Sequence, residues 1–344
     1  MSRLDKRKPR VLVVDDSAAS RAVIAEALED GGCEVVGRAM DGGMALRMVA
    51  DLQPDVITCD LEMPRLDGFT FLRMVAKNFP TPVIVVTLDS RPEAVLQALE
   101  LGARDFVVKP GDSASKMRQL GPALTIRVRA LAQEQNRDVK WAPTPNVSLP
   151  EKIELVAIGA STGGPRALRD VLSGVPGNFK PPIVIVQHMP KRFTAAFADR
   201  LRRHTGHDVA EGRDGEVLRP GVIRIGPGGF HMRVFEKSGS FVLELEEANE
   251  AERHVPSVDF LLETAALAAQ EHLLAVVLTG MGRDGAEGAK TVAKVGAPLW
   301  TESAATAVIE GMPSAAAKSH PLAKELPLDE LSGLLGKVLR TKAI

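Results

Sequence analysis

The chain of 344 residues has little cysteine, no long apolar run and almost no net charge. Its two cysteines, Cys33 and Cys59, lack the spacing of metal ligands and are typical of a protein of the reducing cytosol. No apolar run approaches the roughly 20 residues that span a bilayer, so we expect no direct membrane insertion. A net charge of −1 argues against nucleic acid or an anionic membrane surface as the main partner.

The basic start of the chain does not have the pattern of a secretory signal. Its apolar run is cut short by Asp15-Asp16 before it reaches the length of a signal core. We therefore expect a cytoplasmic protein. The length is sufficient for two domains, each with a core of its own.

The first half of the chain alternates short apolar runs with segments of helical spacing. The predicted strands are 11–14, 35–37, 55–59, 82–86 and 105–108. The predicted helices between them are 20–28, 43–50, 69–77 and 93–101. Five such units predict a doubly wound parallel α/β sheet, with its site at the carboxyl ends of the strands.

Polar residues follow four of these strands. Asp15 and Asp16 follow the first, Asp60 the third, Thr87 the fourth and Lys109 the fifth. Three converging carboxylates would repel one another unless a hard cation lay among them, and Mg²⁺ fits that need. Asp60 can then attack a phosphoryl group, while Lys109 and the Thr87 hydroxyl bind its oxygens. Taken singly, Asp15 also fits a helix cap and Lys109 a solvated charge.

The motifs VVDDS, CDLEMPRLDG and DFVVKP make this half resemble a response-regulator receiver domain. The resemblance implies phosphorylation of Asp60 by a histidine kinase. It also implies Mg²⁺ bound by Asp16 and Asp60, with Asp15 binding through water, and Thr87 and Phe106 as movable switch residues. The segment after Thr87 is shorter than usual in that family, which leaves the path of this loop open.

The join between the halves is rich in proline and has no apolar period. A closing helix over 113–135 is expected to break or kink at Gly121-Pro122. Residues 136–151 have the composition of a linker, and Trp141 within it can pack on either side. We therefore expect a receiver domain at 1–135 and a second domain at 152–344.

The second half begins with a buried strand that ends in a glycine-rich turn. Gly159-x-Ser161-x-Gly163 fits the nucleophile elbow, in which a serine hydroxyl is exposed between a strand and a helix. The same pattern fits a phosphate cradle at a helix N-terminus. These residues alone leave both interpretations open.

Two further buried strands end in residues that can complete a catalytic triad. The run 182–186 leads into His188, and 273–278 leads into a turn that contains Asp284. A serine needs a base near pH 7, and that histidine needs a carboxylate on its other ring nitrogen. We therefore predict a triad of Ser161, His188 and Asp284. Its chain order differs from that of α/β-hydrolases, but geometry defines a triad.

The other histidines are weaker candidates for the base. His231 and His254 lie in predicted loops that can line the cleft, and they are the alternatives to His188. The remaining four lie on or after a charged helix, or at element ends without partners nearby: His204, His207, His272 and His320.

Residues 209–246 differ from the rest of the second half. Short runs such as 221–225 and 241–245 are separated by glycine and charged turns, which predicts antiparallel strands inserted into the frame. The expected fold of this half is a mostly parallel α/β sheet with an antiparallel insertion.

The motifs GASTGG, QHMP, RHVPSVD and LTGMGRDGAEG make residues 152–340 resemble the catalytic domain of chemotaxis protein-glutamate methylesterases. A receiver followed by this domain is that family's arrangement. The resemblance implies hydrolysis of glutamate methyl esters on chemoreceptors, often with glutamine deamidation, and no cofactor for the esterase step. It implies an oxyanion donor at the Met281 backbone and regulation by a receiver that covers the cleft. The turn after Ser161 also offers N–H groups, so Thr162 is a weaker candidate for an oxyanion donor. We expect a monomer.

This chain departs from the family near its C-terminus, where Glu302 replaces a usual glutamine and Ala304 a usual acidic residue. We expect the departure to alter rate or substrate preference and to leave the fold intact. Two other functions compete with the esterase. One is a receiver joined to a non-catalytic module whose GASTGG turn holds an anionic ligand. The other, a DNA-binding output, is disfavoured by the charge balance and the lack of a helix-turn-helix pattern.

Overall fold

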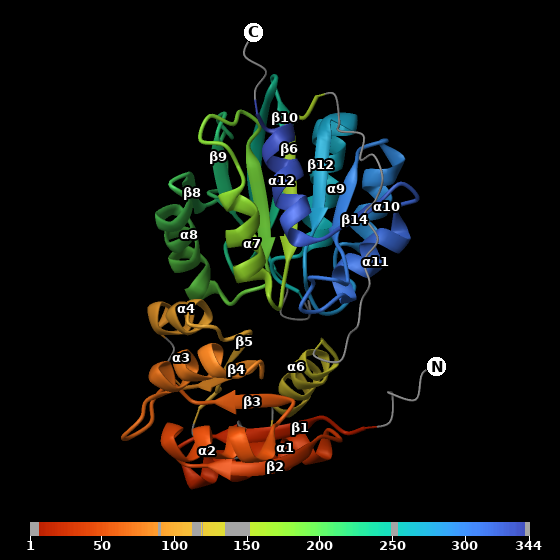
Figure 1. The fold of residues 1–344 in the computed structure, drawn as a ribbon. Helices are drawn as coiled ribbons and strands as arrows, with labels where there is room; N and C mark the ends of the chain where they lie inside the picture. Colours follow the sequence, from red (N-terminus) through yellow and green to blue (C-terminus); the bar gives the residue numbers. More distant parts are fainter. Residues whose placement is uncertain are drawn as a thin grey trace. The chain divides into compact units, whose positions relative to one another are not determined.

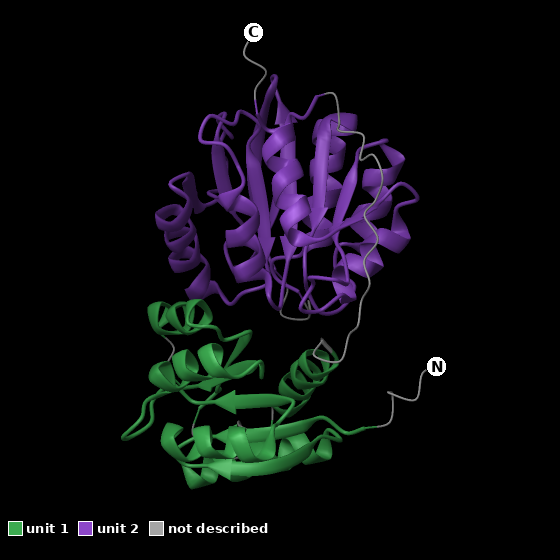
Figure 2. Cartoon of the chain, in the orientation of Figure 1, with its two compact units in different colours: residues 1–138 green, residues 139–344 purple. Residues whose placement is uncertain are grey.

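The computed structural model describes residues 7–88, 91–111, 118, 120–134, 152–248 and 254–340. The chain divides into two compact units, Met1–Asp138 and Val139–Ile344 (Figure 2). The predicted linker at 136–151, with Trp141, lies outside the described residues. Within the described ranges, the helices are all too short or too polar to cross a membrane.

The first unit contains a five-stranded parallel sheet in the order β2-β1-β3-β4-β5 (Figure 1), which confirms the doubly wound fold. Its strands are β1 (Arg10–Val14), β2 (Glu34–Ala39), β3 (Val56–Cys59), β4 (Val83–Thr87) and β5 (Asp105–Val108). Its helices are α1 (Ala18–Asp30), α2 (Gly42–Leu52), α3 (Gly68–Asn78), α4 (Pro92–Glu100) and α6 (Gly121–Glu134). The central strands are mostly apolar and almost wholly buried because helices cover both faces of the sheet.

Short polar side chains fix where several of these helices begin. Ser17, Asp41 and Asp67 each accept a hydrogen bond from the backbone N–H three residues later, at the starts of α1, α2 and α3. The helix expected over 113–135 is broken at this point, as predicted: residue 118 is helical, residue 120 lies in a turn and α6 begins at Gly121, while residues 113–117, 119 and 135 lie outside the described residues. Proline is favourable in a first turn, where its missing N–H removes no helical bond.

The second unit contains a seven-stranded sheet in the order β14-β13-β12-β6-β7-β9-β8, and all its neighbouring strands are parallel. Its strands are β6 (Leu155–Ala160), β7 (Ile183–Gln187), β8 (Asp208–Glu211), β9 (Val222–Ile225), β12 (Leu273–Val277), β13 (Leu299–Glu302) and β14 (Lys324–Leu326). Its helices are α7 (Gly164–Ser173), α8 (Lys191–Thr205), α9 (Val258–Ala269), the 3₁₀ turn η2 (Gln270–His272), α10 (Ala286–Lys294), α11 (Gly311–Ser319) and α12 (Leu328–Val338). Helices α7 and α12 contact each other over one face of the sheet (Figure 1).

Only part of the predicted antiparallel insertion is antiparallel. β10 (Phe230–Lys237) and β11 (Ser240–Glu247) form an antiparallel hairpin, but β8 and β9 pair in parallel within the main sheet, so the prediction was wrong for 221–225. Every residue of β9 is buried, as in a strand covered on both faces. Its charged Arg224 is accommodated by carboxylates of Glu216 at 2.6 Å and Asp208 at 3.3 Å.

Strand order determines where each sheet can hold a ligand. From β6 the chain first adds β7 on one side and later returns to add β12 on the other. In the first unit the same reversal lies between β1 and β3. Loops that leave neighbouring strands in opposite directions open a crevice at their carboxyl ends. In both units the predicted site residues therefore lie at the end of the sheet where this topology binds ligands.

Candidate functional site

Ser161 directly follows β6 in a strand–turn–helix connection. Its backbone N–H donates to the Thr279 carbonyl at 3.0 Å, and its own carbonyl accepts from the Gly164 N–H at 2.8 Å. Gly163 has a φ of +80°, and α7 begins at the next residue. A left-handed residue is accommodated most readily by glycine, so the GASTGG sequence permits this sharp turn.

His188 follows the neighbouring strand at the same level. Ala160 pairs with Gln187 in the β6–β7 register, and the His188 N–H donates to the Ala160 carbonyl at 3.0 Å. Adjacent strands lie about 5 Å apart, so the Cα atoms of Ser161 and His188 are neighbours across the strand ends. The buried Gln187 amide donates to the carbonyls of Ser161 at 2.9 Å and His188 at 3.1 Å, which ties the two backbones together.

The His188 ring is paired with Asp284, which lies in the turn after β12. Nε2 of the imidazole is 2.7 Å from the Asp284 carboxylate. When Nε2 carries the proton that this carboxylate accepts, Nδ1 of the neutral ring has a free lone pair. The His254 ring stacks on the His188 ring, with centroids 4.8 Å apart and an interplanar angle of 11°. His188 thus has a fixed orientation and a basic nitrogen.

Asp284 is held by the beginning of helix α9. Its carboxylate accepts from the Ser257 hydroxyl at 2.9 Å and from the backbone N–H groups of Val258 at 2.8 Å and Asp259 at 2.9 Å. Burial opposes ionisation, but the bonds from His188 and these N–H groups outweigh it and hold the pKa of Asp284 below its ordinary value. The carboxylate therefore stays ionised beside the imidazole.

Asp259 makes the reciprocal contact with helix α10. Its carboxylate accepts from the backbone N–H groups of Gly285 and Gly288, each at 2.8 Å. Burial, and then the negative charge of Asp284, raise the pKa of Asp259 to about 6 despite those bonds. Asp284 thus binds the start of α9, and Asp259 binds the start of α10. The two carboxylates together hold the beginnings of these helices side by side.

The turn after β12 also passes against the nucleophile. A Cβ built on Gly280 would lie 2.9 Å from the Ser161 Cβ, so only glycine allows this approach. Met281 is the next residue, which puts its backbone N–H one residue beyond that contact. The buried Thr162 carbonyl accepts from the Thr279 hydroxyl at 2.9 Å, which joins the two turns. Ser161, Thr162 and the 279–281 turn therefore meet at one edge.

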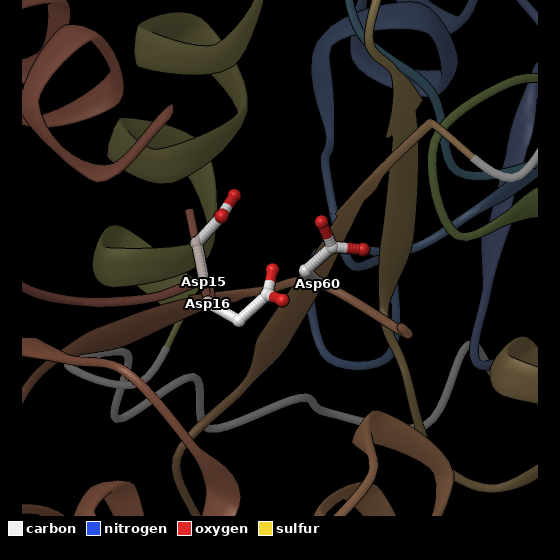
Figure 3. Close-up of side chains that lie close together, drawn as sticks. All are labelled: Asp15, Asp16 and Asp60. Atoms are coloured by element: carbon white, nitrogen blue, oxygen red, sulfur yellow. The ribbon is translucent and has the colours of Figure 1, made fainter. Parts of the chain in front are cut away.

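In the first unit, three carboxylates lie at the ends of β1 and β3. One oxygen each from Asp15, Asp16 and Asp60 lies within 4.8 Å of the others (Figure 3). The Asp60 N–H donates to the Val14 carbonyl at 2.9 Å, which sets β3 beside β1 at this level. Asp15 and Asp60 are buried and Asp16 is exposed, so this acidic cluster opens to solvent on one side.

A buried lysine, Lys109, lies between the two buried carboxylates and offsets part of their charge. Lys109 Nζ lies 2.7 Å from Asp15 and also contacts Asp60. Burial raises the pKa of Asp15 although Lys109 opposes it, while both carboxylates raise the pKa of Lys109 against its own desolvation. The Lys109 N–H donates to the carbonyl of buried Thr87 at 2.9 Å, and half-buried Phe106 lies on β5 beside it.

One expectation about a histidine was wrong. His320 does have partners, because its Nε2 lies 3.0 Å from the Ala297 carbonyl and its Nδ1 accepts from the Leu322 N–H at 3.1 Å. The family departure at Glu302 also has a contact at the site. Its carboxylate is 2 % exposed and accepts from the Thr279 N–H at 2.9 Å.

Sequence reasoning missed four supporting residues, Gln187, Ser257, Asp259 and Thr279. Ser257 had a signal, since serine before an apolar helical run is a typical N-cap. Gln187 and Thr279 adjoin quoted motifs, but their contacts depend on which strands are neighbours. The alternative histidines lie close by: His254 stacks on His188, and His231 Nδ1 accepts from the Ser257 N–H at 3.3 Å.

Two family sequence models match the chain. The CheB methylesterase model matches residues 156–335, and the response regulator receiver domain model matches residues 11–120. Together they cover most of both units.

Curated relatives match over nearly the full length. A "protein-glutamate methylesterase/protein-glutamine glutaminase 1" of Myxococcus xanthus is 41% identical, over 96% of this chain and 97% of the relative. A similarly named protein 3 of Geobacter sulfurreducens is 40% identical, over 95% and 96%. The crystal structure of the Thermotoga maritima CheB methylesterase catalytic domain is 36% identical, covers 54% of this chain and 99% of that one, and has a TM-score of 0.51.

These matches confirm the resemblances in both halves and the assignment as an enzyme. They do not support the alternative of a receiver joined to a non-catalytic module. The chain belongs to the CheB methylesterase family and has a response regulator receiver domain in its first half.

Proposed function

We propose that the chain is a phosphorylation-regulated serine hydrolase that removes methyl groups from glutamate esters of chemoreceptors. Ser161 is the nucleophile, His188 the general base and Asp284 the residue that orients it. The observation that carries the proposal is the 2.7 Å contact between His188 and an ionised Asp284. His188 follows β7, the strand that pairs with the strand leading into Ser161. The proposed domains are 1–135 and 152–344, joined by the linker 136–151.

In the first half-reaction, the Ser161 hydroxyl oxygen adds to the ester carbonyl carbon while its proton passes to His188 Nδ1. The C–O bond to the methoxy group then breaks, and this group takes the proton from His188 and leaves as methanol. Water attacks the acyl-serine in the same way, which releases the glutamate carboxylate and restores Ser161. Asp284 stabilises the imidazolium that forms in each half.

The tetrahedral intermediate carries a negative oxygen that needs N–H donors. We propose the Met281 backbone as the main donor and Thr162 as a further one, because both turns meet beside Ser161. Donors held in place before the reaction stabilise the developing charge without reorganisation, and one is worth about 10²–10³ in rate in other enzymes. The same site can release ammonia from a glutamine side chain, with His188 protonating the leaving amine.

We propose that Asp60 accepts a phosphoryl group from a histidine kinase. Three carboxylate oxygens within 4.8 Å of one another suit Mg²⁺, which prefers oxygen ligands, so Asp16 and Asp60 would bind it directly and Asp15 through water. Bound Mg²⁺ would neutralise charge on the phosphoryl oxygens. Lys109 would bind the same oxygens once released from the carboxylates, and Thr87 and Phe106 would respond to the change.

We propose that this protein works as a cytoplasmic monomer, with chemoreceptors as substrate and a histidine kinase as phosphodonor. The test is methanol release from a methylated receptor fragment, with and without a small-molecule phosphodonor. We expect measurable basal release that increases with the phosphodonor. Absence of release under both conditions would contradict the esterase, and release that ignores the phosphodonor would contradict only the regulation.

A further inference from the structure

We propose that Thr279 is a positioning residue that uses its hydroxyl to set the spacing between the nucleophile turn, Ser161–Thr162, and the oxyanion turn, Gly280–Met281. This inference rests on the proposed esterase function. Thr279 lies two residues beyond the end of β12 and is 1 % exposed. It touches neither the substrate nor the reacting atoms, and its effect is transmitted through the two turns.

The Thr279 hydroxyl bonds on both sides. It donates to the Thr162 carbonyl at 2.9 Å and accepts from the Ile309 N–H at 2.9 Å, a residue that leads into α11. The methyl group of the same side chain packs against Gly163, where an added Cβ would lie 3.1 Å away. The hydroxyl and the methyl group of Thr279 therefore have separate partners. Of these two groups, only the hydroxyl makes hydrogen bonds to Thr162 and Ile309.

The backbone of Thr279 extends the link in two more directions. Its carbonyl accepts from the Ser161 N–H at 3.0 Å, and its N–H donates to buried Glu302 at 2.9 Å. The next residue, Gly280, is clamped by a bond to the Ile309 carbonyl at 2.9 Å and one from the Met312 N–H at 2.8 Å. One residue thus joins the serine turn, the oxyanion turn and β13.

Loss of the hydroxyl should loosen the two turns relative to each other. The Thr162 carbonyl and the Ile309 N–H would lose their buried partner, and both would shift to find others. A displacement of about 1 Å between nucleophile and oxyanion donor can cost about 10²-fold in rate. Substrate binding elsewhere on the domain would not change, so the effect should fall on kcat and spare KM.

The chain offers matched variants for the test. Thr279→Val keeps the shape and the methyl group but removes the hydroxyl, whereas Thr279→Ser keeps the hydroxyl and removes the methyl group. Thr264→Val is the control, because the Thr264 hydroxyl also donates to a backbone carbonyl, of Phe260 at 2.8 Å, and accepts from a backbone N–H, of Val234 at 3.2 Å. Its bonds lie within and beside helix α9, and neither reaches the turns at Ser161.

Steady-state methanol release from a methylated receptor fragment, measured on the full chain, gives kcat and KM for each variant. We expect Thr279→Val to lower kcat by about 10–10²-fold with KM within about twofold, and Thr279→Ser to stay within about threefold of the original chain. Thr264→Val should lower the melting temperature and leave kcat unchanged. If Thr279→Val does not fold, Thr279→Ser and Thr279→Ala, which differ only in the hydroxyl, replace it.

Three results would overturn the positioning role: unchanged kcat in Thr279→Val, equal losses in the variants with and without the hydroxyl, or the same kcat loss in Thr264→Val. Ser161→Ala separates this inference from the proposed function. If Ser161→Ala is inactive while Thr279→Val is fully active, only the role of Thr279 fails. If Ser161→Ala retains turnover, the esterase assignment itself fails.

Discussion

The two parallel sheets hold functional carboxylates at the same topological position but compensate them differently. In the first unit Asp15, Asp16 and Asp60 follow the two strands where the order reverses, and one lysine contacts the two buried carboxylates. In the second unit the order reverses between β6 and β12, and Asp284 lies in the turn after β12. This single carboxylate accepts hydrogen bonds from three donors besides His188.

The difference is visible in the pKa values of the buried carboxyl groups. Burial raises the pKa of Asp15, whereas the bonds to Asp284 overcome burial and lower its pKa. Three carboxylates that converge around one lysine keep a net negative charge that suits a cation, while a single carboxylate held by backbone N–H groups and a hydroxyl is suited to orienting a histidine. What separates these strand-end aspartates is whether they face other carboxylates or a histidine.

The largest effect should come from Ser161→Ala, which removes the nucleophile of the second unit. By analogy with serine proteases, where loss of the nucleophile costs about 10⁶-fold, methanol release should fall below detection. The melting temperature and the phosphorylation of Asp60 should stay unchanged, since the Ser161 side chain is small and the first unit is untouched. Retained turnover in a folded variant would remove the triad assignment.

Asp284→Asn should have the next largest effect, a loss of about 10⁴-fold in kcat, because an amide cannot hold the imidazole in the required tautomer. Asp199→Asn is the control, since Asp199 is a half-exposed carboxylate that pairs with Arg202 and Arg203 of its own helix. It should leave kcat unchanged. Comparable losses in both variants would mean that charge alone, not the contact to His188, matters.

Asp60→Asn tests the acidic cluster of the first unit without touching the second. We expect basal methanol release to remain and the stimulation by a phosphodonor to disappear, because the phosphoryl acceptor is gone. Radiolabel from the phosphodonor should also no longer attach to the chain. Stimulation that persists in Asp60→Asn would refute this residue as the acceptor.

The smallest predicted effect concerns Asp259, whose pKa in the folded chain is raised to about 6. A raised carboxyl pKa means that the folded state binds the proton more tightly, so this group lowers stability as pH rises from about 4 to about 6. Asp259→Asn should remove that dependence. Relative to the original chain, its free energy of unfolding should improve by about 1 kcal/mol between pH 4 and pH 7, after allowance for solvent screening.

Urea unfolding followed by the fluorescence of buried Trp300 can measure this change, in a Trp141→Phe background that leaves a single tryptophan. The sign of the pH dependence is decisive. A variant that loses stability relative to the original chain as the pH rises would contradict the account of the Asp259–Asp284 pair.

Sequence patterns were sufficient for features that depend on the residues of one strand alone, such as its burial and the residue at its end. Mostly apolar runs that lead to Asp60, Ser161 or His188 predicted buried parallel strands with functional residues at their ends. The direction of β9 was not predictable in this way, because strand direction depends on the connection and not on the strand's own residues. Its glycine-punctuated surroundings favoured the wrong alternative.

The supporting contacts were unpredictable for a related reason. Thr279 meets Thr162 across 117 positions of the chain, and Ser257 meets Asp284 across 27. No periodicity relates such pairs, and threonine and serine are ordinary turn residues wherever they occur. The motifs located the chemistry, and only the fold identified what holds it in place.

The central claim is that Ser161 is an activated nucleophile, and reaction with a fluorophosphonate probe followed by peptide mass spectrometry tests it most directly. We predict one covalent adduct on Ser161, formed by the original chain and lost in His188→Ala. A folded chain that forms no adduct, or one whose adduct persists on Ser161 without His188, would contradict the account.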